Sequence, residues 1–136
     1  MANKIFLDTN IVLDLLESSR KNHQNALQLL HYLINNSWEI YISEDMLSTI
    51  YYVAKEKRKA LLFIKKVILT DWSVVHFGES VIKDATRFAL EKDCDLEDAL
   101  QCFCAKSCGC DVFLTADKKF IDCGIEILDY DGFLNG

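Results

Sequence analysis

Short apolar runs alternate with longer segments of helical periodicity along almost the whole chain. The runs predict strands at residues 5–7, 39–42, 73–76, 112–115 and around Ile127. Helices are expected directly after Asp8, from an N-cap at Ser43 through residues 51–53, over about 22–35, 59–69, 79–91 and 96–107, and as a short turn near Lys118. Strands that are separated by helices pair in parallel and need helices on both faces. The order therefore predicts an α/β fold, a three-layer α/β/α sandwich with a central parallel sheet.

Length and composition predict one domain over residues 1–136. Of the 136 residues, 51% are hydrophobic and 26% are charged, and the chain has five glycines and no proline. This balance argues against a disordered chain or a flexible linker. No run of about 18 uncharged apolar residues is present, so we expect no signal peptide, no membrane span and a cytoplasmic protein.

The net charge argues against binding of nucleic acid through bulk electrostatics. The formal charge is −6, whereas such binding rests on neutralising phosphates with Lys and Arg. Six of the 15 basic residues lie between Lys55 and Lys66, the one concentrated positive region of the sequence. A local contact with nucleic acid and a solvated helix face are both open interpretations of this region.

Six cysteines are expected to be free and mostly buried thiols. A core-rich chain without an export signal differs from the small secreted proteins that depend on disulfides. Four of the cysteines fall within nine residues, at positions 102, 104, 108 and 110. This spacing does not match the Cys-x-x-Cys pairs of zinc modules, so packing is the favoured role.

Carboxylates follow two of the expected strands. Asp8 comes directly after the first apolar run and Asp117 comes just after the fourth. Ligands of open parallel sheets collect at the carboxyl ends of the strands, where loops lead into helices. Asp98 is expected in the first turns of the helix that precedes the fourth strand, flanked by Asp95 and Glu97. These positions can converge although they are far apart in the sequence.

A group of acids at such an edge favours a divalent cation. Like charges and burial disfavour ionised carboxylates, and Mg²⁺ or Mn²⁺ offsets this cost with oxygen ligands. The chemistry would be metal-assisted hydrolysis of a phosphodiester, which needs no nucleophilic side chain. Each acid also has a simpler interpretation: Asp8 and Asp117 as helix caps, and Asp95 with Asp98 as a favourable start to a helix dipole.

Three segments together resemble the PIN-domain family of metal-dependent ribonucleases, which includes the VapC-type toxins. They are residues 6–10 (FLDTN), 95–100 (DLEDAL) and 114–120 (LTADKKF), and the similarity extends over essentially the whole chain. The resemblance implies an α/β/α fold, Mg²⁺ or Mn²⁺ at the acidic site and RNA as the substrate. It also implies a toxin role, with a cognate antitoxin and a homodimer as candidate partners.

The resemblance assigns roles residue by residue. Asp8, Asp98 and Asp117 would be the catalytic metal ligands, and Asp95 a further candidate. Asn10 and Thr115 would not bind the metal ion themselves but would orient its ligands or a bound water.

One position departs from the family pattern. Thr49 stands where the family places a glutamate in the helix after the second strand. Asp45, four residues earlier on the same helix face, or Glu44 would have to substitute for it. The alternative is a PIN-like domain that binds RNA or a protein partner without efficient catalysis.

Other phosphate chemistry fits the sequence less well. A phosphatase of the haloacid-dehalogenase type needs a second acid two residues after the first, and Asn10 occupies that place.

Tyr51 and Tyr52 are candidate dimer contacts rather than RNA-stacking residues, because packing is the commoner role of such side chains.

Overall fold

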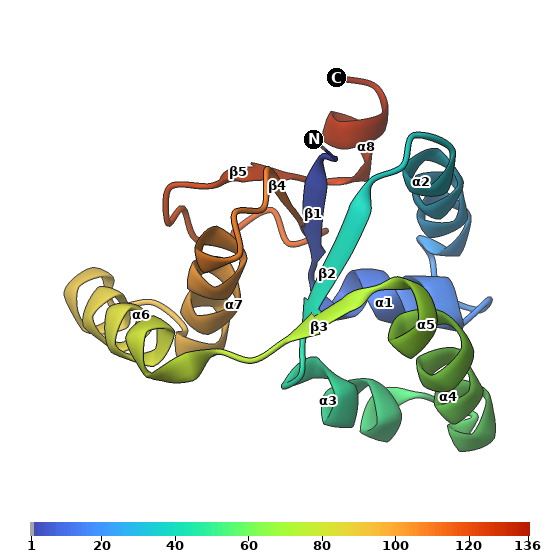
Figure 1. The fold of residues 1–136 in the computed structure, drawn as a ribbon, viewed down its shortest axis with the longest axis horizontal. Coiled ribbons are helices and arrows are strands. Elements are labelled where there is room, and N and C mark those ends of the chain that lie inside the picture. Colours follow the sequence, from blue (N-terminus) through green and yellow to red (C-terminus); the bar gives the residue numbers. More distant parts are fainter. Residues whose placement is uncertain (1) are drawn as a thin grey trace.

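A five-stranded parallel sheet runs through the middle of the computed structural model, which describes residues 2–136 (Figure 1). The strands are β1 (Lys4–Leu7), β2 (Glu39–Ser43), β3 (Ser73–Val75), β4 (Val112–Leu114) and β5 (Glu126–Leu128). Their order is β3-β2-β1-β4-β5, and all neighbouring strands are parallel. The predicted parallel sheet is confirmed.

Helices cover both faces of this sheet. They are α1 (Thr9–Leu16), α2 (His23–Asn35), α3 (Met46–Val53), α4 (Lys57–Phe63), the π-helical segment η1 (Ile64–Ile68), α5 (Leu69–Asp71), α6 (Gly78–Lys92), α7 (Leu96–Ser107) and α8 (Tyr130–Leu134). In Figure 1, α6 and α7 lie on one side of the sheet, and α1, α2, α4 and α5 lie on the other. The three-layer architecture is therefore also confirmed. None of the helices described in residues 2–136 is long and apolar enough to cross a membrane.

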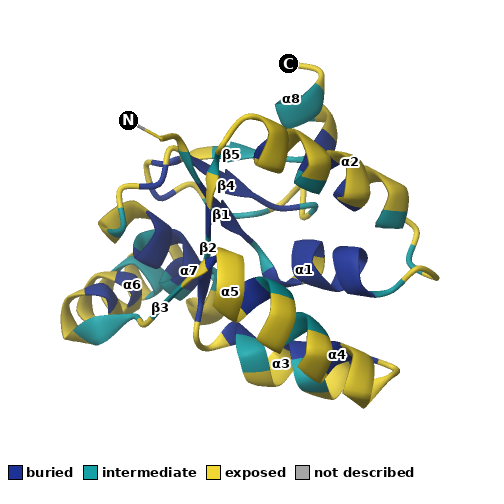
Figure 2. Cartoon of the chain, turned by 45° about the vertical axis from the view of Figure 1, so that its right-hand side comes forward, coloured by how far each residue is buried: buried dark blue, intermediate teal, exposed yellow. Residues whose placement is uncertain are grey.

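The core is centred on β1 and β4, the two neighbouring inner strands. Ile5, Phe6 and Leu7 of β1 have no exposed surface, and neither do Phe113 and Leu114 of β4. Figure 2 shows these strands as buried, with the exposed residues on the outer helices. Strands buried on both faces read as continuous apolar runs, which is why both were visible in the sequence. The residues that directly follow them are attached to fully buried strand ends.

Local structure differs from the expectations in three places. Ser43 is not an N-cap: it ends β2, and α3 begins only at Met46. The segment near Lys118 is a turn, in which the Phe120 N–H donates to the Asp117 carbonyl over 3.2 Å, rather than a turn of helix. The short helix α8 was not among the expected elements. The Asp129 side chain caps it by accepting from the Gly132 N–H over 2.7 Å.

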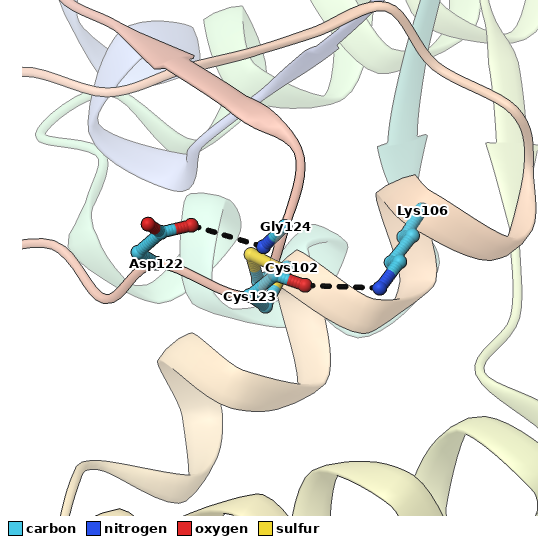
Figure 3. The surroundings of a disulfide bond; sticks show 5 residues. All are labelled: Cys102, Lys106, Asp122, Cys123 and Gly124. Atoms are coloured by element: carbon cyan, nitrogen blue, oxygen red, sulfur yellow. Dashed lines mark hydrogen bonds between the residues drawn. A yellow bond between two sulfur atoms is a disulfide. The ribbon is translucent and has the colours of Figure 1, made fainter.

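The expectation of six free thiols is wrong, because Cys102 and Cys123 form a disulfide (Figure 3). Cys102 lies on α7, and Cys123 lies in the segment that leads into β5. The Lys106 ammonium donates to the Cys123 carbonyl over 3.1 Å, one helical turn beyond Cys102. Spacing along the chain could not reveal this pair, since the two residues meet only when the segment folds back onto α7.

The other four cysteines are free. Burial raises the pKa of the Cys104 and Cys110 thiols to about 12, so both remain neutral and packed. Within residues 2–136 no group of three or more Cys, His, Asp or Glu side chains is arranged to hold a metal ion as the chain stands.

Candidate active site

The carboxyl ends of β1 and β4 lie side by side, because Leu7 pairs in register with Leu114. From β1 the chain continues to β2 and β3 on one side, and it returns to β4 and β5 on the other. A parallel sheet opens a crevice for ligands where the strand order reverses in this way. Asp8 and Thr115 are the first residues after the two strands, so both stand at this point.

Thr115 links the Asp8 carboxylate to the backbone of Asp117. Its buried hydroxyl donates to Asp8 Oδ2 over 2.8 Å and accepts from the Asp117 N–H over 3.1 Å. The other oxygen of Asp8 accepts from the Thr9 N–H over 2.8 Å, so Asp8 also caps α1. The capping interpretation is therefore correct for Asp8, and it leaves the carboxylate fixed at the strand edge.

Asp98 reaches the same edge from the first turn of α7. Asp95 is the N-cap of this helix, and its Oδ1 accepts from the Asp98 N–H over 3.1 Å. Burial, followed by the nearby carboxylates of Asp95, Asp8 and Asp117, raises the pKa of Asp98 to about 6. Burial also raises the pKa of Asp8, and Asp117 adds to this effect. Hydrogen bonds from Thr115 and Thr9 oppose the shift of Asp8. The three predicted aspartates thus lie close enough to repel one another.

Glu97 belongs to this group, although the sequence suggested it only as a neighbour of Asp98. Partial burial and the carboxylates of Asp45, Asp95 and Asp8 raise its pKa. Adjacent helix residues face different directions, so the sequence alone could not show that Glu97 and Asp98 both approach this edge. The only available signal was the acidic first turn of α7.

The start of α3 brings Asp45 toward Glu97. Asp45 is exposed and stands immediately before Met46, the first residue of α3. Its charge contributes to the raised pKa of Glu97, which indicates that the two carboxylates are near each other. Thr49 is exposed within the helix. Glu44 is exposed too, and its N–H donates to the Val75 carbonyl over 2.7 Å.

Asn10 is exposed on α1, and its Oδ1 accepts from Arg20 over 3.4 Å. The structure gives Asn10 no hydrogen bond to the aspartates of the edge. Arg20 is held in turn by Asp14, whose Oδ1 accepts from Arg20 Nε over 2.8 Å. Asp14 is only 4% exposed, and its Oδ2 accepts from the Tyr130 hydroxyl over 2.8 Å. Sequence patterns give no sign of this buried network, because Tyr130 is 116 residues from Asp14.

The donor set of the edge suits a hard divalent cation. Carboxylate oxygens are the ligands that Mg²⁺ and Mn²⁺ prefer. Burial and neighbouring carboxylates raise the pKa values of Asp8 and Asp98, and a bound cation would offset both effects. No three of these side chains converge on one point in residues 2–136. Mg²⁺ usually binds through one or two carboxylates and completes its shell with water and phosphate oxygens. The residues therefore fit an ion with few direct protein ligands.

Comparison with known proteins identifies similar chains. Ribonuclease VapC1 of Aquifex aeolicus (strain VF5) is 34% identical over 137 residues, covering 97% of this chain and 94% of that protein. The crystal structure of Mycobacterium tuberculosis VapC20, a Sarcin-Ricin loop cleaving toxin, has a TM-score of 0.74 at 17% identity, covering 89% of this chain and 95% of that one. A toxin-antitoxin complex from Klebsiella pneumoniae has a TM-score of 0.71 at 19% identity, covering 93% and 97%. Both structures share the fold.

The sequence profile of the PIN domain matches residues 5–125. This range runs from β1 to the segment before β5 and includes Asp8, Asp98 and Asp117. The match covers most of the chain, and the parallel sheet with its acidic strand edge agrees with it. The chain belongs to the PIN domain family.

Proposed function

We propose that this chain is a metal-dependent endoribonuclease and the toxin of a toxin-antitoxin pair. The observation that carries the proposal is that the carboxylates of Asp8 and Asp117 lie near enough to Asp98, at the switch point of the sheet, to raise its pKa. The similarity to Ribonuclease VapC1 over nearly the whole of both chains supports RNA as the substrate.

Asp8, Asp98 and Asp117 would hold Mg²⁺ or Mn²⁺, with Asp95 and Asp45 as further candidate ligands. The ion would supply positive charge for the attacked phosphate and lower the pKa of the attacking water. Thr115 holds the Asp8 carboxylate in one orientation, and the Asp95 cap holds the start of α7 and with it Asp98. Asn10 would orient a metal ligand or a water molecule without binding the ion itself.

An antitoxin is the proposed protein partner, as in the Klebsiella complex. An apolar groove of about 350 Å³ lies between α1 and the α4–η1 helix. Leu15, Leu62, Phe63 and Val67 line it, together with Lys59 and Lys66. This groove suits an amphipathic segment with acidic flanks.

A homodimer remains part of the proposal. A cytoplasmic location also belongs to it, because the enzyme would have to reach cellular RNA.

The second candidate function is an RNA-binding or protein-binding PIN domain without efficient catalysis. The observation that favours it is Thr49, which leaves α3 without a carboxylate at that position. The effect of Asp45 on the pKa of Glu97 favours the enzyme instead, because it indicates that the starts of α3 and α7 bring two other acids near each other.

The test is cleavage of a mixed pool of structured RNA by the purified protein, with Mn²⁺, with Mg²⁺ and with EDTA. We expect cleavage with a metal ion, none with EDTA and none by Asp8→Asn. Asp84→Asn, which changes an exposed aspartate of α6, is the matched control and should cut normally. Metal binding without cleavage by the wild-type protein would favour the binding domain.

A further inference from the structure

A cavity of about 610 Å³ opens directly beside the candidate active site. Thr115 and Asp117 form its border with the acidic edge, and the remaining walls come from residues 118–122 and from residues 125–129. The disulfide holds Cys123, between these two wall segments, against α7 (Figure 3). A strand of RNA whose phosphate lies at Asp117 would therefore bring a neighbouring nucleotide to this cavity.

An aromatic ring at the wall of the cavity ends a column of stacked rings. Phe6 of β1 stacks on Phe113 of β4 with centroids 5.4 Å apart, and Phe113 stacks on Phe120 with centroids 4.6 Å apart. The interplanar angles are 14° and 19°. Phe6 and Phe113 are fully buried, whereas Phe120 is half-buried and lines the cavity. A flat group that stacks on Phe120 would extend a column already fixed by the core.

The polar groups of the cavity are mostly hydrogen-bond acceptors. Four carboxylates line it, those of Asp117, Asp122, Glu126 and Asp129, against one lysine, Lys118. Three of them are fixed by backbone N–H groups at a single oxygen: Asp117 by Lys119, Asp122 by Gly124 and Asp129 by Gly132. The second oxygen of each has no hydrogen bond within the described chain. Such a wall repels phosphate and accepts hydrogen bonds from amino groups.

We propose that this cavity binds one unpaired RNA base with an exocyclic amino group, beside the phosphodiester that is cut. The base would stack on Phe120 and donate its amino protons to the carboxylates of Asp122, Glu126 or Asp129, while the phosphate of its nucleotide remains at the metal-binding edge. The inference rests on the proposed function for its choice of ligand. It adds that the enzyme selects cytosine, adenine or guanine over uracil at one position next to the cut.

The test uses short single-stranded RNAs that carry 2-aminopurine at successive positions, bound to the full-length protein in Mg²⁺, with EDTA as the metal-free comparison. 2-Aminopurine loses fluorescence when it stacks on an aromatic ring. We expect quenching at one position with the wild type and none with Phe120→Leu, which keeps an apolar contact to Phe113. Phe88→Leu is the matched control, because Phe88 packs on Phe103 of α7 outside this cavity, and it should quench like the wild type.

Affinity measurements test the same base without a fluorophore. An abasic nucleotide at the quenched position should weaken binding to the wild type by between about fivefold and about 150-fold, the range for stacking one base on one ring. The same RNA change should have little effect in Phe120→Leu. Purine riboside, which lacks the amino group of adenosine, should bind the wild type more weakly than adenosine at that position.

The outcomes separate this inference from the proposed function. Absence of RNA binding, equal quenching by the wild type and Phe120→Leu, or an abasic penalty that persists in Phe120→Leu overturns the base site. Equal binding of purine riboside and adenosine overturns the requirement for an amino group. Cleavage without position-specific quenching leaves the ribonuclease standing and removes the base site. Quenching at one position without cleavage in Mg²⁺ or Mn²⁺ supports the base site and contradicts the enzyme.

Discussion

Thr115 shows how a neutral side chain can organise an acidic site. Its hydroxyl is used twice, as a donor to Asp8 and as an acceptor from the Asp117 N–H, and it adds no charge to a place where carboxylates already repel one another. Because Thr115 directly follows β4, its position is as rigid as the strand. A partner that orients a metal-binding carboxylate in this way affects the metal site nearly as much as the ligand itself.

Replacing Thr115 by Val should therefore damage the site without changing its shape. We expect Thr115→Val to lower metal affinity or kcat/KM for RNA by roughly 10–100-fold, the usual effect of losing a group that orients a ligand. Thr115→Ser keeps the hydroxyl and should stay close to the wild type. Calorimetry with Mn²⁺ and cleavage kinetics measure the two quantities. Equal values for the Val variant and the wild type would show that the hydroxyl has no such role.

Among the secondary-structure elements, the link between α1 and α8 depends on one buried acid. Asp14 of α1 is paired with Arg20 and accepts from Tyr130 of α8, so two of its interactions come from outside its own helix. Burial and the hydrogen bond to Asp14 raise the pKa of Tyr130, and its hydroxyl therefore stays protonated as a donor. This network anchors the C-terminal helix on the core.

Tyr130→Phe removes that donor and should lower the free energy of unfolding by about 1–3 kcal/mol, because a buried carboxylate loses a hydrogen bond. Urea denaturation monitored by circular dichroism measures the change. Tyr52→Phe is the control: Tyr52 is 76% exposed, and its hydroxyl can bond to water in either state. A stability change equal to that of the control would show that Tyr130 contributes only through packing.

The disulfide links α7, which carries Asp98, to the segment that follows Asp117. It closes a loop with a sequence separation of 21 residues. A cross-link of this size restricts the unfolded chain and contributes about 3 kcal/mol in the loop-entropy account. In a reducing cytoplasm such bonds are rare, so the redox state of the protein would set the stability of this loop.

Reduction should accordingly lower the melting temperature of the wild type. We expect dithiothreitol to lower its Tm and to leave that of the Cys102→Ala/Cys123→Ala double variant unchanged, since only the wild type has this bond to lose. Differential scanning calorimetry gives both values, and intact mass before and after reduction and alkylation counts the thiols. A Tm of the oxidised wild type that does not respond to reductant would contradict the contribution to stability.

Charge is unevenly distributed over the whole molecule. The acids of the site gather at one sheet edge, whereas the basic residues 55–66 lie on and beside α4. Lys57 in this basic region has a structural role: its ammonium donates to the carbonyls of Tyr51, Tyr52 and Ala54 at the end of α3. With a net charge of −6, the molecule as a whole does not attract RNA to the acidic edge. A bound cation should therefore matter for both stability and RNA binding.

The stabilisation by Mg²⁺ should depend on pH with a definite sign. The pKa of Asp98 rises from 3.8 to about 6 in the folded chain. Without metal, the stability that comes from this shift is full below pH 3.8 and is lost as the pH rises through about 6. An ion that binds the charged form should therefore raise Tm more at about pH 7.5 than at about pH 5.

Thermal unfolding with and without Mg²⁺ at the two pH values measures this difference. Asp98→Asn serves as the control, because it removes the titrating group. In that variant we expect a higher metal-free Tm at neutral pH and a smaller pH dependence of the metal effect. An Mg²⁺ effect that is equal at both pH values in the wild type would contradict the linkage.

The sequence by itself determined the parallel sheet, the order of its five strands along the chain with the longer helices between them, and the placement of Asp8 and Asp117 after strand ends. These features follow from local periodicity and from the geometry of parallel strands. The roles of the aspartates as metal ligands are still predictions. The structure adds that the carboxylates of Asp8 and Asp117 lie near enough to Asp98 to raise its pKa. The prediction of an N-cap at Ser43 was wrong, because a serine near the end of a strand resembles an N-cap whether or not a helix begins there.

Tertiary structure alone decided the contacts between residues that are distant along the chain. The Cys102–Cys123 disulfide, the buried Asp14–Tyr130 hydrogen bond and the approach of Glu97 to Asp45 all depend on how helices pack against the sheet. Periodicity tells which face of an element is buried, but it does not tell which partner covers that face. The stacking of Phe120 on Phe113, and the cavity beside it, likewise exist only because the segment after β4 folds back over the sheet.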